Sequence, residues 1–297
     1  MMPTTHPMSA YISQFSAAKV LVIGDVCLDR FVRGHVTRIS SESPIPVMVS
    51  KQESRMLGQA GNTFANLLGL GVQATLLSVI GHDREGDMLR SLVEAGGADS
   101  QYLLTNPHCP TTIKTRYMAG HQQVFRVDTE GALSCIPSIE VQLIEKLTAF
   151  IPTQNAVILS DYGYGVLSHA VIRAAIDAAH AAGIPVLVDP RGSDLSKYQG
   201  ATVATPNRKE LSEATGGDAT DPDSQVVMAA EKLMKQSGIC ALVATRSQDG
   251  MSIVEQNSPP VHLRTTAREV FDVSGAGDTV IATIAAALAV GANLVEA

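Results

Sequence analysis

Residues 156–189 have the sequence AVILSDYGYGVLSHAVIRAAIDAAHAAGIPVLVD. A short apolar run at 156–161 precedes a segment with helical spacing of apolar residues at 167–182, and a second apolar run follows at 185–189. This order predicts a strand, a helix and a second strand parallel to the first.

The same alternation extends along the rest of the chain. Further strands are predicted at residues 19–24, 75–80, 201–205 and 240–245, and further helices at 60–70, 84–95, 139–150, 224–236 and 276–290. Uninterrupted apolar runs such as VLVIG are typical of strands buried on both faces. We therefore expect an α/β fold with a mostly parallel central sheet flanked by helices, and ligands at the carboxyl ends of its strands.

Two stretches, residues 31–56 and 111–128, interrupt this alternation with paired strand patterns that have no helix between them. They can form extra antiparallel edge strands on the main sheet, or a small separate sheet that acts as a lid over the strand ends. The periodicity fits both alternatives equally. We treat residues 1–297 as one domain that includes these two segments.

The composition indicates a globular protein. Hydrophobic residues make up 45% of the 297 residues, and the formal net charge is −7, so neither disorder nor a general attraction to nucleic acid or anionic membranes is expected. The four cysteines have no metal-ligand spacing, the N-terminus lacks a signal-peptide pattern, and the longest apolar run, 280–290, is too short to span a membrane. These features favour a cytoplasmic enzyme that acts on small molecules.

The motif DVSGAGDT at residues 272–279 precedes the helix predicted from residue 276. Glycines at a helix start allow backbone N–H groups to point at an anion such as phosphate. The dinucleotide pattern G-x-G-x-x-G is excluded because Val280 occupies the third glycine position. Asp278, in the first turn, can simply complement the helix dipole, or it can accept a hydroxyl proton during phosphoryl transfer.

DVSGAGDT resembles the D-[TS]-x-G-A-G-D motif of the ribokinase-like (phosphofructokinase B) carbohydrate kinases. The segments GDVCLD (24–29), TRISSESPIPV (37–47), NRKE (207–210), TRSQDGM (245–251) and VFDVSGAGDTV (270–280) resemble one branch of that family, which acts on D-glycero-β-D-manno-heptose 7-phosphate. The resemblance implies transfer of the ATP γ-phosphoryl group to the anomeric hydroxyl, with Mg²⁺, in ADP-heptose and lipopolysaccharide core biosynthesis. It also implies a lid sheet that forms a homodimer, Asp278 as catalytic base, and Gly275, Ala276 and Gly277 as an anion hole.

Candidate acceptor-binding residues lie near the first strand and in the expected lid. Asp25 and Asp29 can accept hydrogen bonds from sugar hydroxyls, or they can be solvated loop acids. Gly58 and Asn62 in GQAGN resemble the family's sugar-contacting segment, in which Gln59 here replaces a second glycine. Three cations are expected to bind the phosphate of the acceptor or to form an exposed charged face: Lys114, Arg116 and Arg126.

Asp161, in SDYGYG, matches an acceptor-site aspartate of the heptose branch, but Tyr164 stands where that branch has lysine. On the nucleotide side, Asn207 and Glu210 resemble an N-x-x-E pair that organises magnesium through water, although helix capping explains the same spacing. The resemblance also implies nucleotide contacts from four other residues: Asp189, Arg191, Thr245 and Gly250. Arg191 replaces a lysine of the branch.

Three functions remain open from the sequence. The first is the heptose 7-phosphate kinase, the second is a related kinase of another sugar or sugar phosphate, and the third is a non-catalytic sugar-phosphate-binding protein. The third is motivated by Gln59, by Tyr164 and by the end of the chain at Ala297, where relatives continue with segments that close the adenine pocket. We expect no adenylyl transfer, because the 297 residues contain no nucleotidyltransferase half.

Overall fold

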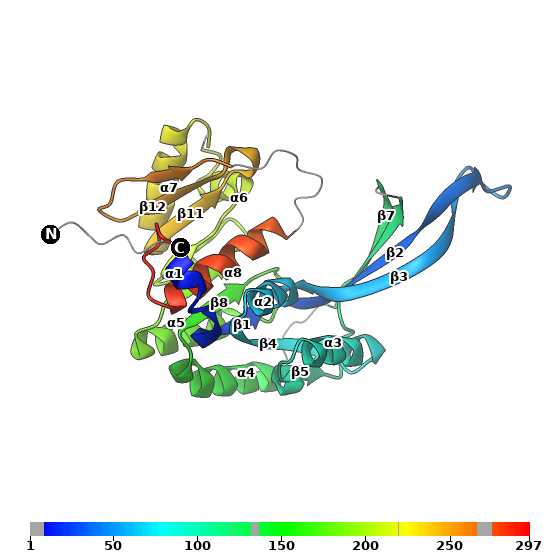
Figure 1. Ribbon diagram of the computed structural model, residues 1–297, viewed down its shortest axis with the longest axis horizontal. Helices are drawn as coiled ribbons and strands as arrows, with labels where there is room; N and C mark the ends of the chain where they lie inside the picture. Colours follow the sequence, from blue (N-terminus) through cyan, green and yellow to red (C-terminus); the bar gives the residue numbers. More distant parts are fainter. Residues whose placement is uncertain (1–8, 121, 132–136, 219, 266–274) are drawn as a thin grey trace.

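The computed structural model describes residues 9–120, 122–131, 137–218, 220–265 and 275–297. Residues 272–274, which begin the DVSGAGDT motif, lie outside the described residues. The described chain contains a nine-stranded sheet and a separate four-stranded sheet. Figure 1 shows the first sheet inside the helical body and the second extending away from it.

The nine-stranded sheet has the order β13-β12-β11-β10-β9-β8-β1-β4-β5. The strands are β13 (Val261–Leu263), β12 (Met251–Glu255), β11 (Ala241–Thr245), β10 (Val203–Ala204), β9 (Val186–Asp189), β8 (Ala156–Ser160), β1 (Lys19–Gly24), β4 (Gln73–Gly81) and β5 (Leu103–Asn106). All neighbours from β11 to β5 pair in parallel, whereas β12 and β13 add an antiparallel edge. The predicted mostly parallel central sheet is confirmed.

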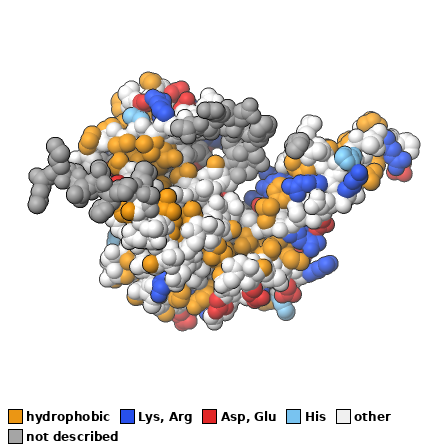
Figure 2. Space-filling model, in the orientation of Figure 1, with side chains coloured by type: hydrophobic (Ala, Val, Ile, Leu, Met, Phe, Trp, Pro, Cys, Tyr) orange, Lys and Arg blue, Asp and Glu red, His pale blue; other side chains and the backbone are white. Residues whose placement is uncertain are grey.

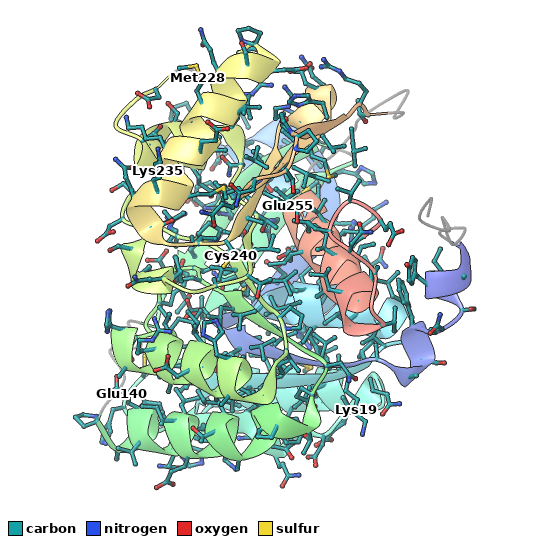
Figure 3. All side chains as sticks on the ribbon, turned by 90° about the vertical axis from the view of Figure 1, so that its left-hand side faces the viewer. Lys19, Glu140, Met228, Lys235, Cys240 and Glu255 are labelled. Carbon is teal, nitrogen blue, oxygen red and sulfur yellow. The ribbon has the colours of Figure 1, made fainter. Side chains whose placement is uncertain are left out.

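Helices cover both faces of this sheet. One face packs against α4 (Pro137–Phe150), α5 (His169–Ala182) and α7 (Asp223–Ser237), and the other against α2 (Ala60–Gly69), α3 (Arg84–Ala95) and α8 (Ala276–Ala289). Figure 3 shows Glu140 on α4 and Met228 on α7 on the side of the molecule opposite α8. Two short helices add to these layers: α6 (Arg208–Ala214) contributes Leu211 to the core beneath α4, α5 and α7, and α1 (Ser9–Ile12) packs Tyr11 against the core on the other face.

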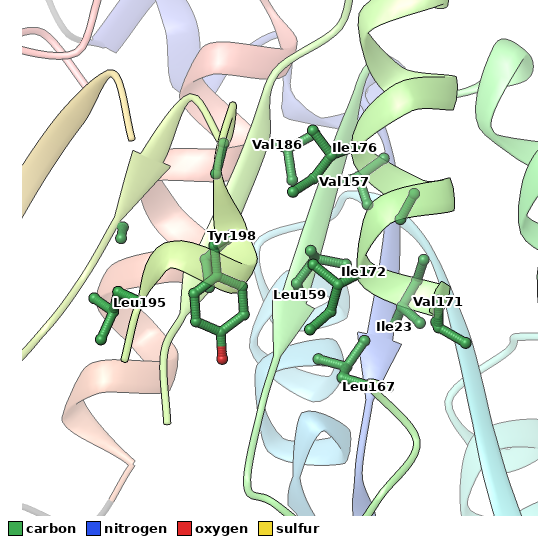
Figure 4. Close-up of a cluster of buried hydrophobic side chains, with 14 of the residues drawn as sticks. Ile23, Val157, Leu159, Leu167, Val171, Ile172, Ile176, Val186, Leu195 and Tyr198 are labelled. Atoms are coloured by element: carbon green, nitrogen blue, oxygen red, sulfur yellow. The ribbon is translucent and has the colours of Figure 1, made fainter. Parts of the chain in front are cut away.

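Alternating side chains along the strands give the molecule two hydrophobic cores. In β1, Leu21 and Ile23 belong to the core beneath α4 and α5, whereas Val20 and Val22 belong to the core beneath α2 and α8. Figure 4 shows Ile23 with the strand and helix side chains of the first core. Because successive strand side chains point to opposite faces, an apolar residue is needed at every position of a strand covered on both faces.

The four-stranded sheet, called here the lid sheet, has the order β3-β2-β6-β7. It consists of β2 (Val26–Ile39), β3 (Pro46–Gln59), β6 (Ile113–Ala119) and β7 (Gln122–Thr129). Strand pairing is antiparallel within each hairpin and parallel between β2 and β6. The two irregular sequence stretches therefore form a separate sheet and not edge strands, but the first pair begins at Val26, earlier than the expected residue 31, and ends at Gln59.

No helix among the described residues combines the length and the apolar character needed to cross a membrane.

Candidate active site

Asp278 lies in the first turn of α8, at the carboxyl ends of the central strands. Its Oδ2 accepts a hydrogen bond from Asn62 Nδ2 (2.7 Å), and its Oδ1 accepts from Thr63 Oγ1 (2.8 Å) and from the Tyr162 hydroxyl (3.1 Å). The preceding cap, Gly275, has φ +80°, and a Cβ there would lie 2.6 Å from Asn62 Nδ2. Glycine is thus required where the chain turns into the helix.

Asp278 is buried, with only 7% of the residue exposed. Burial raises its pKa above the ordinary value, while hydrogen bonds from Asn62, Thr63 and Tyr162 lower it in part. A first-turn position by itself favours the ionised form through the helix dipole, whereas burial makes Asp278 a stronger base than an exposed aspartate. Tyr162 and Thr63 were missed as partners because 116 and 215 residues, respectively, separate them from Asp278.

A cavity of about 980 Å³ opens beside Asp278. It is bordered by Tyr162, by the start of α8 from Gly275 to Asp278, and by residues of β9, α6 and β11 to β13. Five of the six expected nucleotide-side residues line it: Asp189, Asn207, Glu210, Thr245 and Gly250. Arg191 is not among the lining residues, but its charge partly opposes the rise in the pKa of Glu210 that burial causes.

Asn207 and Glu210 form a capping box at the start of α6. The Asn207 side chain accepts hydrogen bonds from the backbone of Lys209 (2.9 Å) and Glu210 (3.0 Å), and Glu210 Oε2 accepts one from Asn207 N (2.9 Å). The capping alternative is therefore confirmed. It does not remove the pair from the cavity, because both residues also line it.

Carboxyl groups around the cavity repel one another. Burial, together with the charges of Asp278 and Glu210, raises the pKa of Asp189 to about 8. Burial also raises the pKa of Glu210. In the part of the chain that the structure describes, no three His, Cys, Asp or Glu residues converge closely enough to bind a metal ion directly. The oxygen-rich wall suits a hard cation such as Mg²⁺ held through water.

Asp25 is almost fully buried, with 1% of its surface exposed. Its carboxylate accepts hydrogen bonds from the backbone N–H groups of Tyr162 (3.0 Å), Tyr164 (3.1 Å) and Val166 (3.0 Å). The sequence analysis expected Asp25 to be a solvated loop acid or an acceptor for sugar hydroxyls, and it did not predict these hydrogen bonds to the backbone. The contacts show that Asp25 fixes the loop after β8.

One face of the lid sheet carries five of the expected acceptor-site residues: Asp29, Gly58, Lys114, Arg116 and Arg126. Strand register places Asp29 beside Lys114, and Arg116 beside Arg126. Arg116 forms an ion pair with Asp29, and Arg126 forms one with Asp128 (3.0 Å). Figure 2 shows basic side chains gathered where the lid sheet leaves the body.

Gly58 is needed on this face because a Cβ there would meet Asp29 and would lie 2.7 Å from Cys27 Sγ. Gln59, the neighbouring residue that replaces a glycine of the family, has φ +58° and is buried. Neither polar atom of its side-chain amide has a hydrogen-bond partner among the described residues. Both features carry an energetic cost, which a glycine at this position avoids.

Lys114 differs from the two arginines because, within the described ranges, it has no carboxylate at ion-pair distance. Its Nζ lies 5.8 Å from the ring centroid of Tyr162 and 5.5 Å from that of Tyr164. Asp161, in contrast, is already engaged, since its Oδ2 accepts from Lys197 Nζ (2.7 Å) and from the Tyr198 hydroxyl (2.6 Å). Neither partner could be predicted from the sequence, because 36 and 37 residues separate them from Asp161.

Solved structures with the same fold include Escherichia coli phosphofructokinase-2 in complex with potassium, with a TM-score of 0.76 at 21% identity, over 93% of this chain and 87% of that one. Arabidopsis thaliana ribokinase complexed with ribose and ATP has a TM-score of 0.74 at 21% identity, over 94% of this chain and 88% of that one. These likenesses establish the ribokinase-like fold.

Sequence comparison gives closer relatives. The chain is 48% identical over 96% of its length to the bifunctional protein HldE of Paramagnetospirillum magneticum, and 44% identical over 100% of its length to that of Rhodospirillum rubrum. It spans 58% and 60% of those two proteins, respectively. Residues 17–297 match the pfkB family of carbohydrate kinases. The chain therefore belongs to the pfkB carbohydrate kinase family.

Proposed function

We propose that the protein transfers the γ-phosphoryl group of ATP to the anomeric hydroxyl of D-glycero-β-D-manno-heptose 7-phosphate, giving the 1,7-bisphosphate for ADP-heptose and lipopolysaccharide core synthesis. The observation that carries this proposal is the buried Asp278 carboxylate, at the start of α8 and at the edge of the large cavity. The choice of sugar is supported by the segments that resemble the heptose branch and by the HldE relatives.

Asp278 acts as the general base in this proposal. It removes the proton of the anomeric hydroxyl while that oxygen forms a bond to the γ-phosphorus and the bond from that phosphorus to the β–γ bridging oxygen breaks, which releases ADP. The backbone N–H groups of Gly275, Ala276 and Gly277 have no acceptor within the first turn of α8 and can stabilise the phosphoryl oxygens. The raised pKa of Asp278 favours its role as proton acceptor.

ATP occupies the large cavity in this proposal. Thr245 and Gly250 contact the nucleotide, Asp189 lies toward its phosphates, and Asn207 and Glu210 would hold Mg²⁺ through water. Arg191, whose charge acts on Glu210, lies toward the phosphates from outside the cavity wall. The free oxygen-donor capacity of Glu210 fits this role, because the capping box uses Oε2. Mg²⁺ neutralises part of the phosphate charge during transfer.

The acceptor lies between Asp278 and the lid sheet. Asn62, Asp29, Gly58 and Asp161 shape the sugar site, and the cations bind the 7-phosphate. Of these cations, Lys114 is the best placed for phosphate, since Arg116 and Arg126 already pair with aspartates. We also place the enzyme in the cytoplasm, where ATP is available, as a homodimer joined through the lid sheet.

The experiment that tests this function measures ADP release from Mg-ATP with four acceptors: the heptose 7-phosphate, ribose, fructose and fructose 6-phosphate. We expect selective, saturable turnover of the heptose 7-phosphate. Preference for another sugar would contradict the substrate assignment, and binding of the sugar without turnover would contradict the kinase assignment.

A further inference from the structure

The loop between β8 and α5 places two tyrosine rings at the base of the lid sheet. Asp25, at the end of β1, binds the backbone N–H groups of both tyrosines, Tyr162 and Tyr164. The loop also has glycines at φ +78° (Gly163) and +110° (Gly165), conformations that other residues rarely adopt. The backbone that carries both rings is thus fixed relative to the central sheet.

The two rings contact the ammonium group of Lys114. Its Nζ lies within about 6 Å of both ring centroids, at 5.8 Å from Tyr162 and 5.5 Å from Tyr164, which is the range of cation–π attraction. Lys114 comes from β6 of the lid sheet, whereas the rings belong to the body. The contact therefore joins the two parts of the molecule at the acceptor site.

Each ring is also held at its hydroxyl end. The Tyr162 hydroxyl donates to Asp278 Oδ1 (3.1 Å), and the Tyr164 hydroxyl donates to Glu130 Oε1 (2.9 Å). Glu130 follows directly after β7. Tyr164 is consequently anchored to the body by its backbone and to the lid sheet by its side chain.

We propose that Tyr164 is a positioning residue for acceptor specificity, which holds the Lys114 ammonium where it binds the phosphate of a phosphorylated sugar. This inference rests on the proposed function and extends it to a residue at which the chain departs from the heptose branch. The acceptors favoured by this arrangement are sugars that carry a phosphomonoester remote from the reacting hydroxyl.

An aromatic ring suits this task better than a charged side chain. A carboxylate in contact with Lys114 would neutralise the ammonium and compete with the incoming phosphate, as happens at Arg116 and Asp29. A lysine at position 164 would repel Lys114. The ring face attracts the ammonium while leaving its charge available to the ligand.

A double-mutant cycle tests the proposal through the KM of the phosphorylated acceptor. Tyr164→Leu should raise this KM about three- to tenfold and change kcat much less, because the ring orients Lys114 without touching the reacting atoms. Lys114→Ala should raise the KM for the phosphorylated sugar more than for its unphosphorylated analogue. In the Lys114→Ala background, Tyr164→Leu should have little further effect, because the group that it positions is gone.

Two further variants separate the ring from the hydroxyl and from general packing effects. Tyr164→Phe keeps the ring and loses only the hydrogen bond to Glu130, so it should recover most of the lost affinity. Tyr102→Leu is a matched control, since Tyr102 lies 5.7 Å from Lys146 Nζ in a similar contact outside the cavity walls. It should leave the acceptor KM unchanged.

Additive effects of Tyr164→Leu and Lys114→Ala, or equal losses for phosphorylated and unphosphorylated sugars, would overturn the proposal. Calorimetric binding of heptose 7-phosphate and of fructose 6-phosphate supplies a readout that does not need turnover. Failure of the proposed function would appear as preference for another acceptor with the Tyr164–Lys114 coupling intact. Failure of this inference would appear as normal heptose turnover without that coupling.

Discussion

The three hydrogen bonds to Asp278 define what a single substitution there should do. Asp278→Asn preserves the size of the side chain and leaves oxygen Oδ1 able to accept from Thr63 and Tyr162. It removes the proton acceptor, so we expect kcat to fall by about 10²- to 10⁴-fold or more. Mg-ATP binding, measured by calorimetry, should remain largely intact because the rest of the cavity wall is unchanged. A variant with near-normal kcat would remove Asp278 from the base role.

Asp189 should make the stability of the protein fall as the pH rises toward 8. Its pKa is about 8 in the folded protein, against 3.8 ordinarily, so the folded state holds a proton that the unfolded chain has released between these two values. The stabilising contribution of the Asp189 proton is therefore fully present below the unfolded pKa and is lost as the pH rises through the folded pKa.

Urea unfolding at pH 5.5, 7 and 8 measures this effect. Asp189→Asn should flatten the pH dependence, since the amide stays neutral throughout. Asp194→Asn is the control, because the pKa of Asp194 is lowered and that carboxyl is ionised in both states over this range. Equal slopes for the wild type and Asp189→Asn would show that Asp189 is not protonated in the folded protein.

At the scale of elements, Asn207 has a structural role, capping α6, and a proposed functional role, holding Mg²⁺ through water. Two substitutions distinguish these roles. Asn207→Ala removes both hydrogen bonds that its side chain accepts and should lower the free energy of unfolding by about 1 kcal/mol. Asn207→Ser keeps a cap and should restore most of this stability, but its shorter side chain should not restore Mg-ATP affinity. Full recovery of both properties in Asn207→Ser would limit Asn207 to capping.

The sequence predicted best those helices and strands whose ends are marked by residues next to them in the chain. β1 and α3 have the predicted bounds, 19–24 and 84–95, because β1 is a short uninterrupted apolar run that ends at Gly24, and α3 has helical spacing of apolar residues and ends before Gly96. The start of the lid sheet was placed at residue 31 instead of Val26 for a different reason. Only Asp25 separates β1 from β2, and this break is held by backbone groups 137 to 141 residues away.

In the candidate site, too, local features were predicted from the sequence and contacts between distant segments were not. The glycine turn before α8, proposed here to bind phosphate, and Asp278 both lie in eight consecutive residues, so the sequence indicated both. Two features of the site could not be predicted: the contacts of Lys114 with the rings of Tyr162 and Tyr164, and the ion pair of Asp29 with Arg116. Both depend on how segments far apart in the sequence pack against one another. Short motifs predict chemistry, whereas contacts between distant elements determine which charges remain available to a ligand.

At the scale of the whole molecule, the lid sheet is the part with the most unusual surface. It extends from the body (Figure 1). Several of its large apolar side chains are exposed to solvent in the single chain. Phe125 is 62% exposed, Ile39 61% and Val49 53%, and Ile45, between β2 and β3, is 57% exposed. Such a concentration on two adjacent hairpins is typical of a surface that another chain covers.

A second copy of this chain is the occupant we propose, since the lid sheet presents the same hairpins to its equivalent in a symmetric pair. The wild type should be a dimer by sedimentation velocity at micromolar concentration, and Phe125→Asp should be a monomer because a charge buried in an apolar interface is costly. Met228→Asp is the matched control: Met228 is 68% exposed on α7, which lies at the other end of the molecule from the lid sheet (Figure 1), and its replacement should leave the dimer intact. A monomeric wild type would contradict the proposed dimer. A Phe125→Asp dimer of unchanged affinity would show that the dimer contact lies outside the lid sheet.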